Sequence, residues 1–457
     1  MQLTVKEICE KIWDLENKYN LLTREFQGVK VWHLLRMNLY YDIVQETGVF
    51  GQPHTKRNGI ADRIKEISSF LYSSFINNPL RGNHKKKIVV FDHPRKRIVN
   101  NKYIDIYTNY LINSLDEDDV LVLEQSYLNK HFTEPEAKRK HTDYLQILTV
   151  LMSKIYRINF NNQEAALIKT LEDEMYDLFG TKLNLNKKFL EALKKYKIRY
   201  RLYDNLFKTI KPEKIFIVVS YSYGSLIAAA KHNSIPVIEI QHGTISPYHL
   251  GYSFPNCDQE LEYFPDYFYS FGQYWGESVK LPIGQDKIIP YGFPYFKDLK
   301  KDYEGIVKNT KQLLFLSQGV IGKELSRFAY QAALELKDYK IIYKLHPGEY
   351  DRWQEEYEEL KLAERLENFT IVDNDKVNLY QYLAESQYQI GVFSTAVYEG
   401  FAFRCKTILI DLPGVEYMND LVNDGFAKKV GNVEELQEAL KQDNYKDIDI
   451  NYFFSNM

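Results

Sequence analysis

The chain has 457 residues, which is too long for one hydrophobic core and fits two domains of about 200 residues each with an extension. Its 59 Lys and Arg residues nearly balance its 62 Asp and Glu residues, so no global basic field indicates a nucleic-acid partner. The three cysteines are far apart, which excludes a disulfide framework and a CxxC metal site and is typical of a cytoplasmic protein.

The sequence carries no signal for membrane insertion. The N-terminal segment is charged and amphipathic, and no run of about 18 apolar residues occurs, so a soluble protein without a signal peptide is expected. The basic stretch from Arg81 to Lys87 could contact the anionic inner face of a membrane, which would make the protein peripheral to it. A solvated linker explains the same residues.

Residues 1–84 are expected to form a helical extension. Apolar residues in this part of the chain recur at the spacing of one helix face, namely Val31, Leu34, Leu35 and Leu39. The polar stretch from Asn77 to Lys87 would then link the extension to the rest of the chain.

Residues 85–300 have the pattern of a Rossmann-like domain. Short apolar runs alternate with helical segments, the longest from Tyr127 to Ile210, and this alternation implies a parallel sheet with crossovers. The expected strands are Ile88–Pro94, Val120–Gln125, Lys214–Ser222, Ile235–Gly243, Asp266–Gly272 and Lys287–Pro294.

Residues 301–440 repeat the pattern as a second Rossmann-like domain, so the predicted fold class is α/β. The tail, residues 441–457, ends in aromatic residues that are expected to pack back on the first domain. The expected strands of the second domain are Gln312–Gln318, Lys340–Pro347, Phe369–Asp373, Tyr388–Ser394 and Lys406–Gly414.

The segment GVFSTAVYEG has the features of a phosphate site. Its apolar strand ends at Phe393, and Ser394 and Thr395 are good N-cap residues for a following helix. A helix N-terminus binds phosphate through its free backbone N–H groups. Glu399, one turn into that helix, could bind the two hydroxyls of a nucleotide ribose or face solvent. An ordinary helix cap explains Ser394 and Thr395 equally well.

The segment KLHPGE adds a second strand end in the same domain. His346 ends the strand, and a histidine held there could donate a hydrogen bond to a phosphoryl oxygen or protonate a leaving phosphate. Ser317 and Gln318 end the first strand of this domain and are expected to line the same crevice. A structural role for His346 is the alternative.

In the first domain, His242 lies just past a strand and before Gly243, where a backbone can approach a ligand closely. A neutral imidazole there is a candidate base for an acceptor hydroxyl, with an ordinary pKa of about 6.5. Glu239 is expected to point elsewhere, either because side chains alternate along a strand or because it faces a polar partner. The segment DHPRKR places Asp92 and Arg95 at another strand end, either to bind an anionic acceptor or as a basic turn.

Four short motifs occur in a recognisable order, namely HGT (His242–Thr244), YGFP (Tyr291–Pro294), HP (His346 and Pro347) and FST (Phe393–Thr395). This order resembles that of the bacterial CDP-glycerol glycerophosphotransferases of teichoic acid synthesis. The HP and Ser/Thr pair is also similar to the cytidine-nucleotide sites of bacterial polysialyltransferases and capsule Kdo transferases. The resemblance covers about residues 214–414.

The resemblance implies a GT-B fold, in which two Rossmann-like domains face a cleft. It implies a nucleotide-donor site in the C-terminal domain and an acceptor site in the N-terminal one, with no metal or other cofactor. By this resemblance His242 is the base, His346, Ser394 and Thr395 bind the donor phosphate, and Gly243 and Thr244 lie on the acceptor side.

The sequence departs from the teichoic acid enzymes at two places. Ile245, Ser246 and Pro247 follow HGT where those enzymes carry Pro, Leu and Lys, and Tyr295 and Phe296 replace Arg-Asn-Asp after YGFP. These departures favour a sugar donor over a glycerol phosphate donor. The acidic base motif of the polysialyltransferases is not found here, so Asp92 and Glu124, at strand ends, are the alternatives to His242.

We therefore expect a bacterial glycosyltransferase of capsule or other surface polysaccharide synthesis. It would transfer a sugar from a CMP- or CDP-linked donor to a glycan or lipid-linked glycan acceptor. The alternatives are a CDP-glycerol or ribitol-type polyol-phosphate transferase, a GT-B sugar-nucleotide epimerase, and a non-catalytic glycan-binding partner in an assembly. An epimerase is expected to have more carboxylates and an Arg-rich nucleotide loop near the HP motif.

Two acidic runs resemble metal-binding DxD motifs, namely Asp373–Asp375 and Asp116–Asp119. Acidic runs in loops are commonly solvated, and a helix dipole with nearby side chains can stabilise the leaving phosphate instead. We therefore expect catalysis without a metal. Domain closure over the donor is expected, with a hinge between Pro294 and Asp302.

Overall fold

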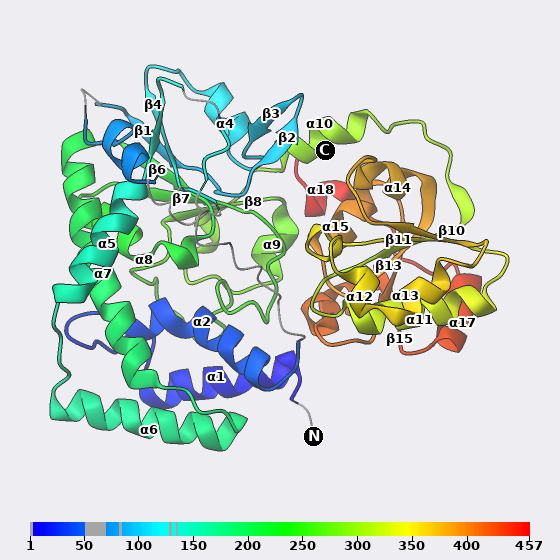
Figure 1. The fold of residues 1–457 in the computed structure, drawn as a ribbon, viewed down its shortest axis with the longest axis horizontal. Coiled ribbons are helices and arrows are strands. Elements are labelled where there is room, and N and C mark those ends of the chain that lie inside the picture. The colour runs from blue at the N-terminus through cyan, green and yellow to red at the C-terminus, as the bar shows by residue number, and fades with distance from the viewer. Residues whose placement is uncertain (1–2, 51–69, 82–84, 128–129, 134–135) are drawn as a thin grey trace.

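The computed structural model describes residues 3–50, 70–81, 85–127, 130–133 and 136–457. Within these residues the chain forms two α/β domains that lie side by side (Figure 1). The first sheet contains β1 (Ile88–Phe91), β4 (Val120–Glu124), β5 (Arg139–His141), β6 (Lys214–Ile217), β7 (Val237–Ile240), β8 (Tyr267–Ser270) and β9 (Ile288–Pro290). The second contains β10 (Asn309–Leu316), β11 (Lys340–Lys344), β12 (Phe369–Val372), β13 (Ser386–Gly391), β14 (Lys406–Ile410) and β15 (Ala427–Val430).

Both sheets are parallel and share a six-strand order, to which the first sheet adds β9 at one edge. The first runs β5-β4-β1-β6-β7-β8-β9 and the second runs β12-β11-β10-β13-β14-β15. In each sheet the first strand of the chain is an inner one. The next strands are added on one side of it and the later strands on the other side. The direction in which strands are added therefore reverses between β1 and β6 in the first sheet and between β10 and β13 in the second. Sheets of this kind bind ligands beyond the carboxyl ends of the strands at the reversal. The structure thus confirms the predicted α/β fold of two Rossmann-like domains.

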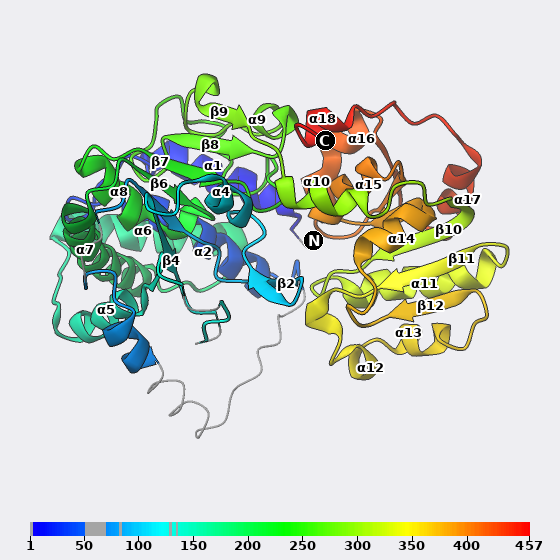
Figure 2. The ribbon, with the colours of Figure 1, turned by 90° about the horizontal axis from the view of Figure 1, so that it is seen from above.

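Helices cover both sheets (Figures 1 and 2). Those of the first domain are α4 (Asn109–Ser114), α5 (Asp143–Ile155), α6 (Asn162–Phe179), α7 (Leu185–Ile210), α8 (Gly224–His232) and α9 (Gln273–Glu277). Those that follow are α10 (Pro294–Lys301), α11 (Gly322–Glu335), α12 (Trp353–Glu356), α13 (Glu358–Ala363), α14 (Leu379–Glu385), α15 (Thr395–Ala402), α16 (Asn419–Asn423), α17 (Val433–Lys441) and α18 (Ile450–Phe453).

The N-terminal helices α1 (Val5–Tyr19) and α2 (Val31–Glu46) pack against α6 and α7 in one hydrophobic core. Helix α1 begins with a capping box, in which the Thr4 hydroxyl accepts from the Glu7 backbone N–H and the Glu7 carboxylate accepts from Thr4. Residues 51–69 of the expected helical extension lie outside the described residues.

Some elements were not expected from the sequence. A hairpin of β2 (Arg97–Val99) and β3 (Lys102–Ile104) follows β1, and strand β5 interrupts the segment expected to be helical. The hairpin turns at Asn100 and Asn101, both with positive φ, which asparagine tolerates better than most residues and which suits a two-residue hairpin. Strand β6 is also shorter than expected, because the chain turns at Val219 into a short 3₁₀-helix, Ser220–Ser222.

The tail joins the two domains. The indole N–H of Trp275 in α9 donates to the backbone carbonyl of Phe453 at 2.7 Å, and the Phe453 ring packs against Tyr398 and Phe401 of α15. The segment expected to be a hinge forms helix α10, and the chain then enters β10.

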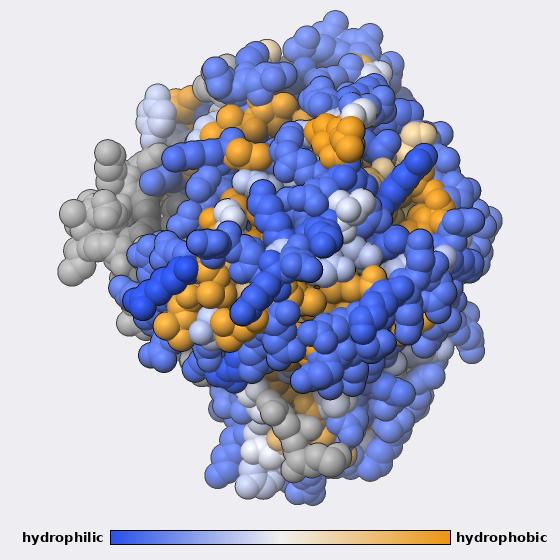
Figure 3. Space-filling view, turned by 90° about the vertical axis from the view of Figure 1, so that its right-hand side faces the viewer, coloured by the Kyte–Doolittle hydropathy of each residue, from blue (hydrophilic) through white to orange (hydrophobic). Residues whose placement is uncertain are grey.

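The surface of the second domain seen in Figure 3 is mostly hydrophilic, with separate smaller hydrophobic patches. No described helix has the length and apolar character needed to cross a membrane. Part of the basic stretch expected at a membrane, residues 82–84, lies outside the described residues. Its described residues Lys86 and Lys87 bond to the loop before β4, at the Asp118 carbonyl and the Asp119 carboxylate respectively.

A buried ion pair holds α1 to α2. The Arg36 guanidinium binds both oxygens of Glu16 at 2.7 and 3.0 Å, and it also donates to the carbonyls of Leu250 and Ser253 in the first domain. Arg36 and Glu16 are 1% and 4% exposed, so neither charge can be solvated if the other is removed.

Replacing Glu16 with Gln should therefore lower the free energy of unfolding of the first domain by about 3 to 5 kcal/mol, because a buried guanidinium loses its counter-charge. Urea denaturation measures this loss. The matched control is Glu10→Gln, which removes an exposed partner of Lys6 in the same helix and should change stability by under about 0.5 kcal/mol. Equal losses in the two variants would contradict the assigned role.

Candidate functional site

A cavity of about 580 Å³ lies between the two domains. Five of the residues singled out in the sequence line it: Thr244 from the first domain, and Gln318, His346, Ser394 and Thr395 from the second. They follow β7, β10, β11 and β13, so the carboxyl ends of both sheets meet at this cavity. This is the cleft expected between the domains.

The two domains touch through a pair of threonines in this cavity. The backbone N–H of Thr244 donates to the Thr395 hydroxyl at 3.1 Å, and the two hydroxyl oxygens are also 3.1 Å apart. Gly243 lies close by, since a Cβ added there would be 3.5 Å from the same Thr395 oxygen. The HGT and FST motifs, 151 residues apart, therefore form one site.

Helix α15 begins at this site. The Ser394 hydroxyl accepts from the Ala396 backbone N–H at 3.2 Å, which makes Ser394 the N-cap that the sequence predicts. The positive end of the helix dipole thus faces the cavity, where it favours an anionic ligand.

His346 has a defined proton position. Its Nδ1 accepts from the Gly348 backbone N–H at 3.1 Å, so the ring hydrogen of the neutral form is on Nε2. Partial shielding from water, followed by the positive charges of Arg95, Arg97 and Lys344, lowers the pKa of His346 to about 4. His346 is therefore a neutral hydrogen-bond donor at neutral pH.

A buried carboxylate fixes the His346 loop. Glu349 accepts from the His346 backbone N–H at 2.7 Å, the Ser317 hydroxyl at 2.9 Å and the Tyr357 hydroxyl at 2.8 Å. The Ser317 hydroxyl is thus engaged inside the domain and does not line the cavity. Gln318 does line it, and its buried side-chain oxygen has no hydrogen-bond partner.

Glu399 is buried in α15 and does not line the cavity, so the solvent-facing alternative is wrong. Burial raises its pKa to about 7, while a hydrogen bond from Tyr380 and the charge of Arg97 act in the opposite direction. Arg97 belongs to the β2–β3 hairpin of the first domain, which lies at the domain boundary (Figure 2).

The hairpin region brings two arginines toward His346. Arg95 and Arg97 are exposed, have no carboxylate partner among the described residues, and act on the pKa of His346 through their charge. Arg95 was expected on the acceptor side. Its positive charge also acts on His346 in the HP motif of the second domain. Asp92 is buried and forms ion pairs with Lys96 and Arg139, both at 2.5 Å. It does not line the interdomain cavity, and it does not line a second cavity that lies within the first domain.

His242 is oriented by a chain of two buried side chains. The Tyr252 hydroxyl donates to Glu239 at 2.5 Å, and its oxygen lies 3.4 Å from Nδ1 of His242. Because the single hydroxyl hydrogen goes to Glu239, the Tyr252 oxygen accepts from Nδ1–H of His242. The hydrogen of the neutral ring is then on Nδ1, and Nε2 is a proton acceptor without a hydrogen-bond partner among the described residues. His242 itself lines neither this cavity nor the larger one in the first domain.

Burial, then the nearby rings of His93 and His249, lower the pKa of His242 to about 3. Its neutral form therefore persists well below the ordinary histidine pKa of about 6.5 that was expected, and the same shift makes Nε2 a weaker proton acceptor than an ordinary imidazole. Glu239 was expected to point away from His242, by strand alternation or toward a polar partner, and its bonds from the Tyr252 hydroxyl and the Ser220 backbone N–H confirm the polar partner. Glu239 reaches His242 through Tyr252 because β7 ends at Ile240, so strand alternation no longer applies at His242.

Backbone strain accompanies this arrangement. Val219, two residues after the end of β6, has φ 67° and ψ 61°, a left-handed conformation that a β-branched residue rarely adopts. This turn directs the Ser220 backbone N–H to Glu239 at 3.0 Å. The strain thus maintains the carboxylate that orients Tyr252 and His242.

Helix α2 forms an aromatic wall of the cavity that the sequence reasoning missed. Tyr40 and Tyr41 line it from α2, Phe50 from the loop that follows, and Phe393 and Tyr417 from the second domain. The Tyr40 and Tyr417 hydroxyls are hydrogen bonded to each other. No sequence signal distinguishes these aromatic residues from ordinary core residues, because their role depends on how α2 packs.

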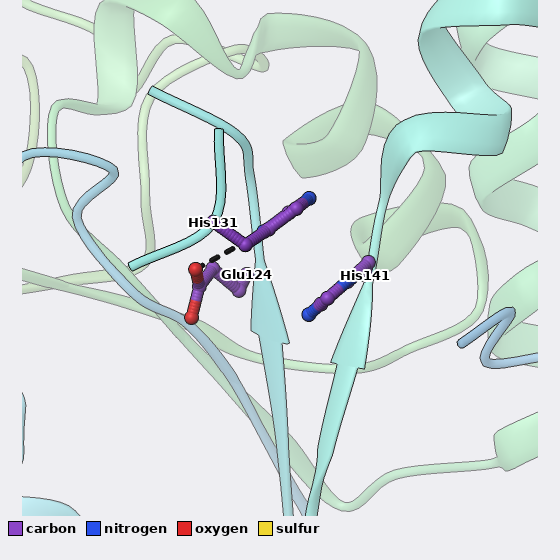
Figure 4. A group of neighbouring side chains, drawn as sticks. All are labelled: Glu124, His131 and His141. Carbon is purple, nitrogen blue, oxygen red and sulfur yellow. Dashed lines mark hydrogen bonds and ion pairs between the residues drawn. The ribbon is translucent and has the colours of Figure 1, made fainter. Parts of the chain in front are cut away.

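A second cluster of ionisable groups lies beside β4 and β5. Glu124, His131 and His141 bring their ligand atoms within 4.8 Å of one another, as a metal site would (Figure 4). Both nitrogens of His131 already contact carboxylates, Glu124 at 3.0 Å and Asp143 at 2.8 Å. Burial lowers the pKa of His131, but the hydrogen bonds to the two carboxylates outweigh burial and raise this pKa to about 9. The ring is therefore an imidazolium.

The charges of this cluster balance without a metal. The carboxylates of Asp92, Glu124 and Asp143 face the cations of Lys96, Arg139 and His131. A divalent cation would have to displace the His131 protons and face Arg139, so these residues do not fit a metal. Asp92 and Glu124, the alternative bases, are thus both committed to buried ion pairs.

No protein-family model matches this sequence, and a search of the curated proteins finds no match. Among solved structures, UDP-GlcNAc 2-epimerase from Methanocaldococcus jannaschii is similar, at 11% identity and a TM-score of 0.46 over 80% of this chain and 95% of that chain. The enzyme of that name from Neisseria meningitidis, bound to UDP-GlcNAc, has 13% identity and a TM-score of 0.43 over 81% and 96%.

The wall teichoic acid polymerase TagF has 11% identity and a TM-score of 0.39 over 84% of this chain and 89% of that chain. Identities and TM-scores this low carry no argument about activity. The fold assignment rests on the two sheets and on the cavity between them.

If Nε2–H of His346 binds a phosphate, His346→Ala should weaken binding of the best ligand among CMP, CDP, UDP and GDP by about 1 to 3 kcal/mol, the range for a hydrogen bond to a charged group. Isothermal titration calorimetry measures this change. The control is His232→Ala, which removes an exposed histidine of α8 that lines neither cavity and should leave the affinity unchanged. Unaltered affinity in His346→Ala would rule out this contact.

Proposed function

We propose that this chain is a glycosyltransferase that takes a sugar from a nucleotide-linked donor, with CMP- or CDP-linked donors favoured, in the synthesis of a bacterial surface polysaccharide. The observation that carries this proposal is the opposite proton placement on the two motif histidines. His346 presents a hydrogen-bond donor in the second domain, and His242 presents a proton acceptor in the first.

The donor phosphate would bind to the second domain. Nε2–H of His346, the hydroxyl of Thr395 and the N-terminus of α15 would hold its oxygens. Arg95 would supply a positive charge from the opposite domain, and the unpartnered oxygen of Gln318 would accept from the nucleotide. The aromatic wall offers flat surfaces for a base or a sugar.

The acceptor hydroxyl would lose its proton to Nε2 of His242. Its oxygen would then form a bond to the anomeric carbon of the donor, while the bond from that carbon to the phosphate oxygen breaks. The leaving nucleotide takes the electron pair, and Nε2–H of His346 with the helix dipole stabilises its new charge. The His242 imidazolium would be stabilised by Glu239 through Tyr252.

A GT-B sugar-nucleotide epimerase is the second candidate, because Glu239, with a pKa raised to about 7 by burial, is linked through Tyr252 to His242 and the two could act as an acid-base pair. The two functions differ in their need for an acceptor. An epimerase converts its nucleotide-sugar alone, whereas a transferase releases nucleotide slowly by hydrolysis and rapidly when an acceptor is added.

Transfer should depend on His242. A positioned base contributes roughly 10² to 10⁴ in rate, so His242→Ala should lose that factor in kcat while nucleotide affinity, which belongs to the other domain, stays constant. The readout is nucleotide release from CMP-, CDP- and UDP-sugars with added glycan acceptors, and EDTA should not change it. His232→Ala, which removes an exposed histidine of the first domain that lines neither cavity, serves as the control and should keep the wild-type kcat. A His242→Ala variant that keeps more than about a tenth of turnover would refute this base.

The pH dependence of kcat should reflect the protonation of the Glu239 carboxylate. Burial raises its pKa to about 7, so its carboxylate gains a proton as the pH falls through 7 and no longer holds Tyr252 and His242 in place. We expect kcat to fall roughly tenfold from pH 8 to pH 6. In Glu239→Gln, kcat should be low and this acid limb should disappear.

The matched control for the pH profile is Glu277→Gln, which removes an exposed carboxylate that accepts from the Tyr452 hydroxyl at 2.8 Å. It should keep the wild-type profile. An acid limb that persists in Glu239→Gln would show that another group titrates.

A further inference from the structure

A second and larger cavity, of about 810 Å³, lies within the first domain. Its lining includes the segments that follow β1, β4 and β6, so it sits at the carboxyl ends of the strands where the order of the first sheet reverses. Helices α2 and α7 form its walls. This is the position where open α/β sheets bind ligands, and the donor site described above does not use it.

The two cavities adjoin. Met37 and Tyr41 of α2 line both of them. His93, which lines the larger cavity, lies against His242 with a ring separation of 6.2 Å. A molecule in the larger cavity would therefore have one end close to the proposed base and the donor.

The larger cavity carries two positive charges without counter-charges. Lys195 and Arg199 lie one turn apart on α7 and both line the cavity. Neither has a carboxylate partner among the residues that the structure describes, and Nε of Arg199 is buried without a hydrogen bond. Like charges at this spacing repel each other, and the charge of Arg199 is the main cause that lowers the pKa of Lys195.

The other charged side chains of the lining are neutralised by the protein. Arg36 is paired with Glu16, Lys188 binds Asp42 at 2.7 Å, and Glu191 lies 3.9 Å from Lys187. The cavity is therefore positive at Lys195 and Arg199 specifically. Helix α8 also begins here, at Gly224, and its N-cap residue Tyr223 makes no side-chain cap, so its positive end is available to an anion.

The remaining walls suit a sugar. Tyr41, Tyr196, Tyr221 and Tyr223 line the cavity, and Gln125 adds a polar group. Aromatic rings with a few polar groups are typical of sites for small polar molecules that also present an apolar face.

We propose that this cavity binds the end of the acceptor glycan and that Lys195 and Arg199 recognise a negatively charged group on it, a carboxylate or a phosphate. The statement that the bound sugar is the acceptor rests on the proposed glycosyltransferase function, while the binding of an anionic sugar in this cavity does not depend on it. The acceptor is thus an acidic sugar chain whose charged residue lies against α7 and whose hydroxyl reaches His242.

Binding of model sugars to the full chain tests this directly. The probes are glucuronic acid for a carboxylate, glucose 6-phosphate for a phosphate and glucose as the neutral reference, with affinity measured by saturation-transfer NMR titration. We expect at least one anionic sugar to bind tenfold or more tightly than glucose. The difference between the two anionic probes identifies the charged group. No preference for either anionic sugar over glucose would overturn the proposal.

Lys195→Gln/Arg199→Gln should lose that tenfold preference. The matched control, Lys194→Gln/Lys197→Gln, removes the same charge from residues of α7 that do not line the cavity and should stay within twofold of wild type. Arg199→Lys keeps the positive charge but loses the planar guanidinium, so it should lose part of the preference for the anionic sugar. This variant replaces the double variant in the test if the double variant does not fold. Equal losses in both double variants would overturn the proposal, because general charge would then explain binding.

A competition experiment with nucleotides tests this inference separately from the proposed function. Saturating CMP, CDP, UDP or GDP should not displace the anionic sugar, since the nucleotide belongs to the other cavity. Displacement would show that the larger cavity is a nucleotide site and would overturn the proposal. Nucleotide binding that requires His346, together with no binding of anionic sugar, would reject the acidic acceptor and leave the proposed transferase standing.

Discussion

The site depends on hydrogen bonds between two threonines, one from each domain. Thr244 and Thr395 meet because all strands of a parallel sheet end at one edge, and the two sheets present those edges to each other. This contact brings the loop that carries His242 next to the helix that is capped by Ser394, and it leaves between them a cavity that neither domain could form alone.

His346 lines that cavity and His242 lies two residues before Thr244, and hydrogen bonds from other residues decide where each ring carries its hydrogen. A backbone N–H from Gly348 puts the hydrogen of His346 on Nε2, whereas Tyr252, held by Glu239, puts the hydrogen of His242 on Nδ1. Shielding from water keeps both rings neutral at physiological pH. The same residue type therefore serves as a donor on one side and an acceptor on the other, which suits a reaction that moves a proton from an acceptor while charge develops on a leaving phosphate.

The sequence was sufficient for the buried apolar strands and for the residues directly beyond them, because buried parallel strands are short apolar runs and ligands bind where they end. It did not predict β2, β3, β5 or β15, which are short and contain charged residues. It was not sufficient for contacts set by packing. The link from Glu239 to His242 needs Tyr252, which lies in a loop, and the aromatic wall needs α2 to lie across the cleft. The Asn-Asn turn between β2 and β3 was a readable signal that went unused, and it would have placed Arg97 on a hairpin.

In the proposed function the second domain would bind the anionic donor phosphate at a helix N-terminus, and the first domain would supply the base. A crystal structure with the nucleotide that binds most tightly tests this division most directly. The account predicts its phosphate within hydrogen-bond distance of Nε2 of His346 and of the start of α15, with the contact between Thr244 and Thr395 opened or bridged by the ligand. A phosphate bound instead against Lys195 and Arg199 in the first domain, or a complex with the interdomain cavity unchanged, would contradict it.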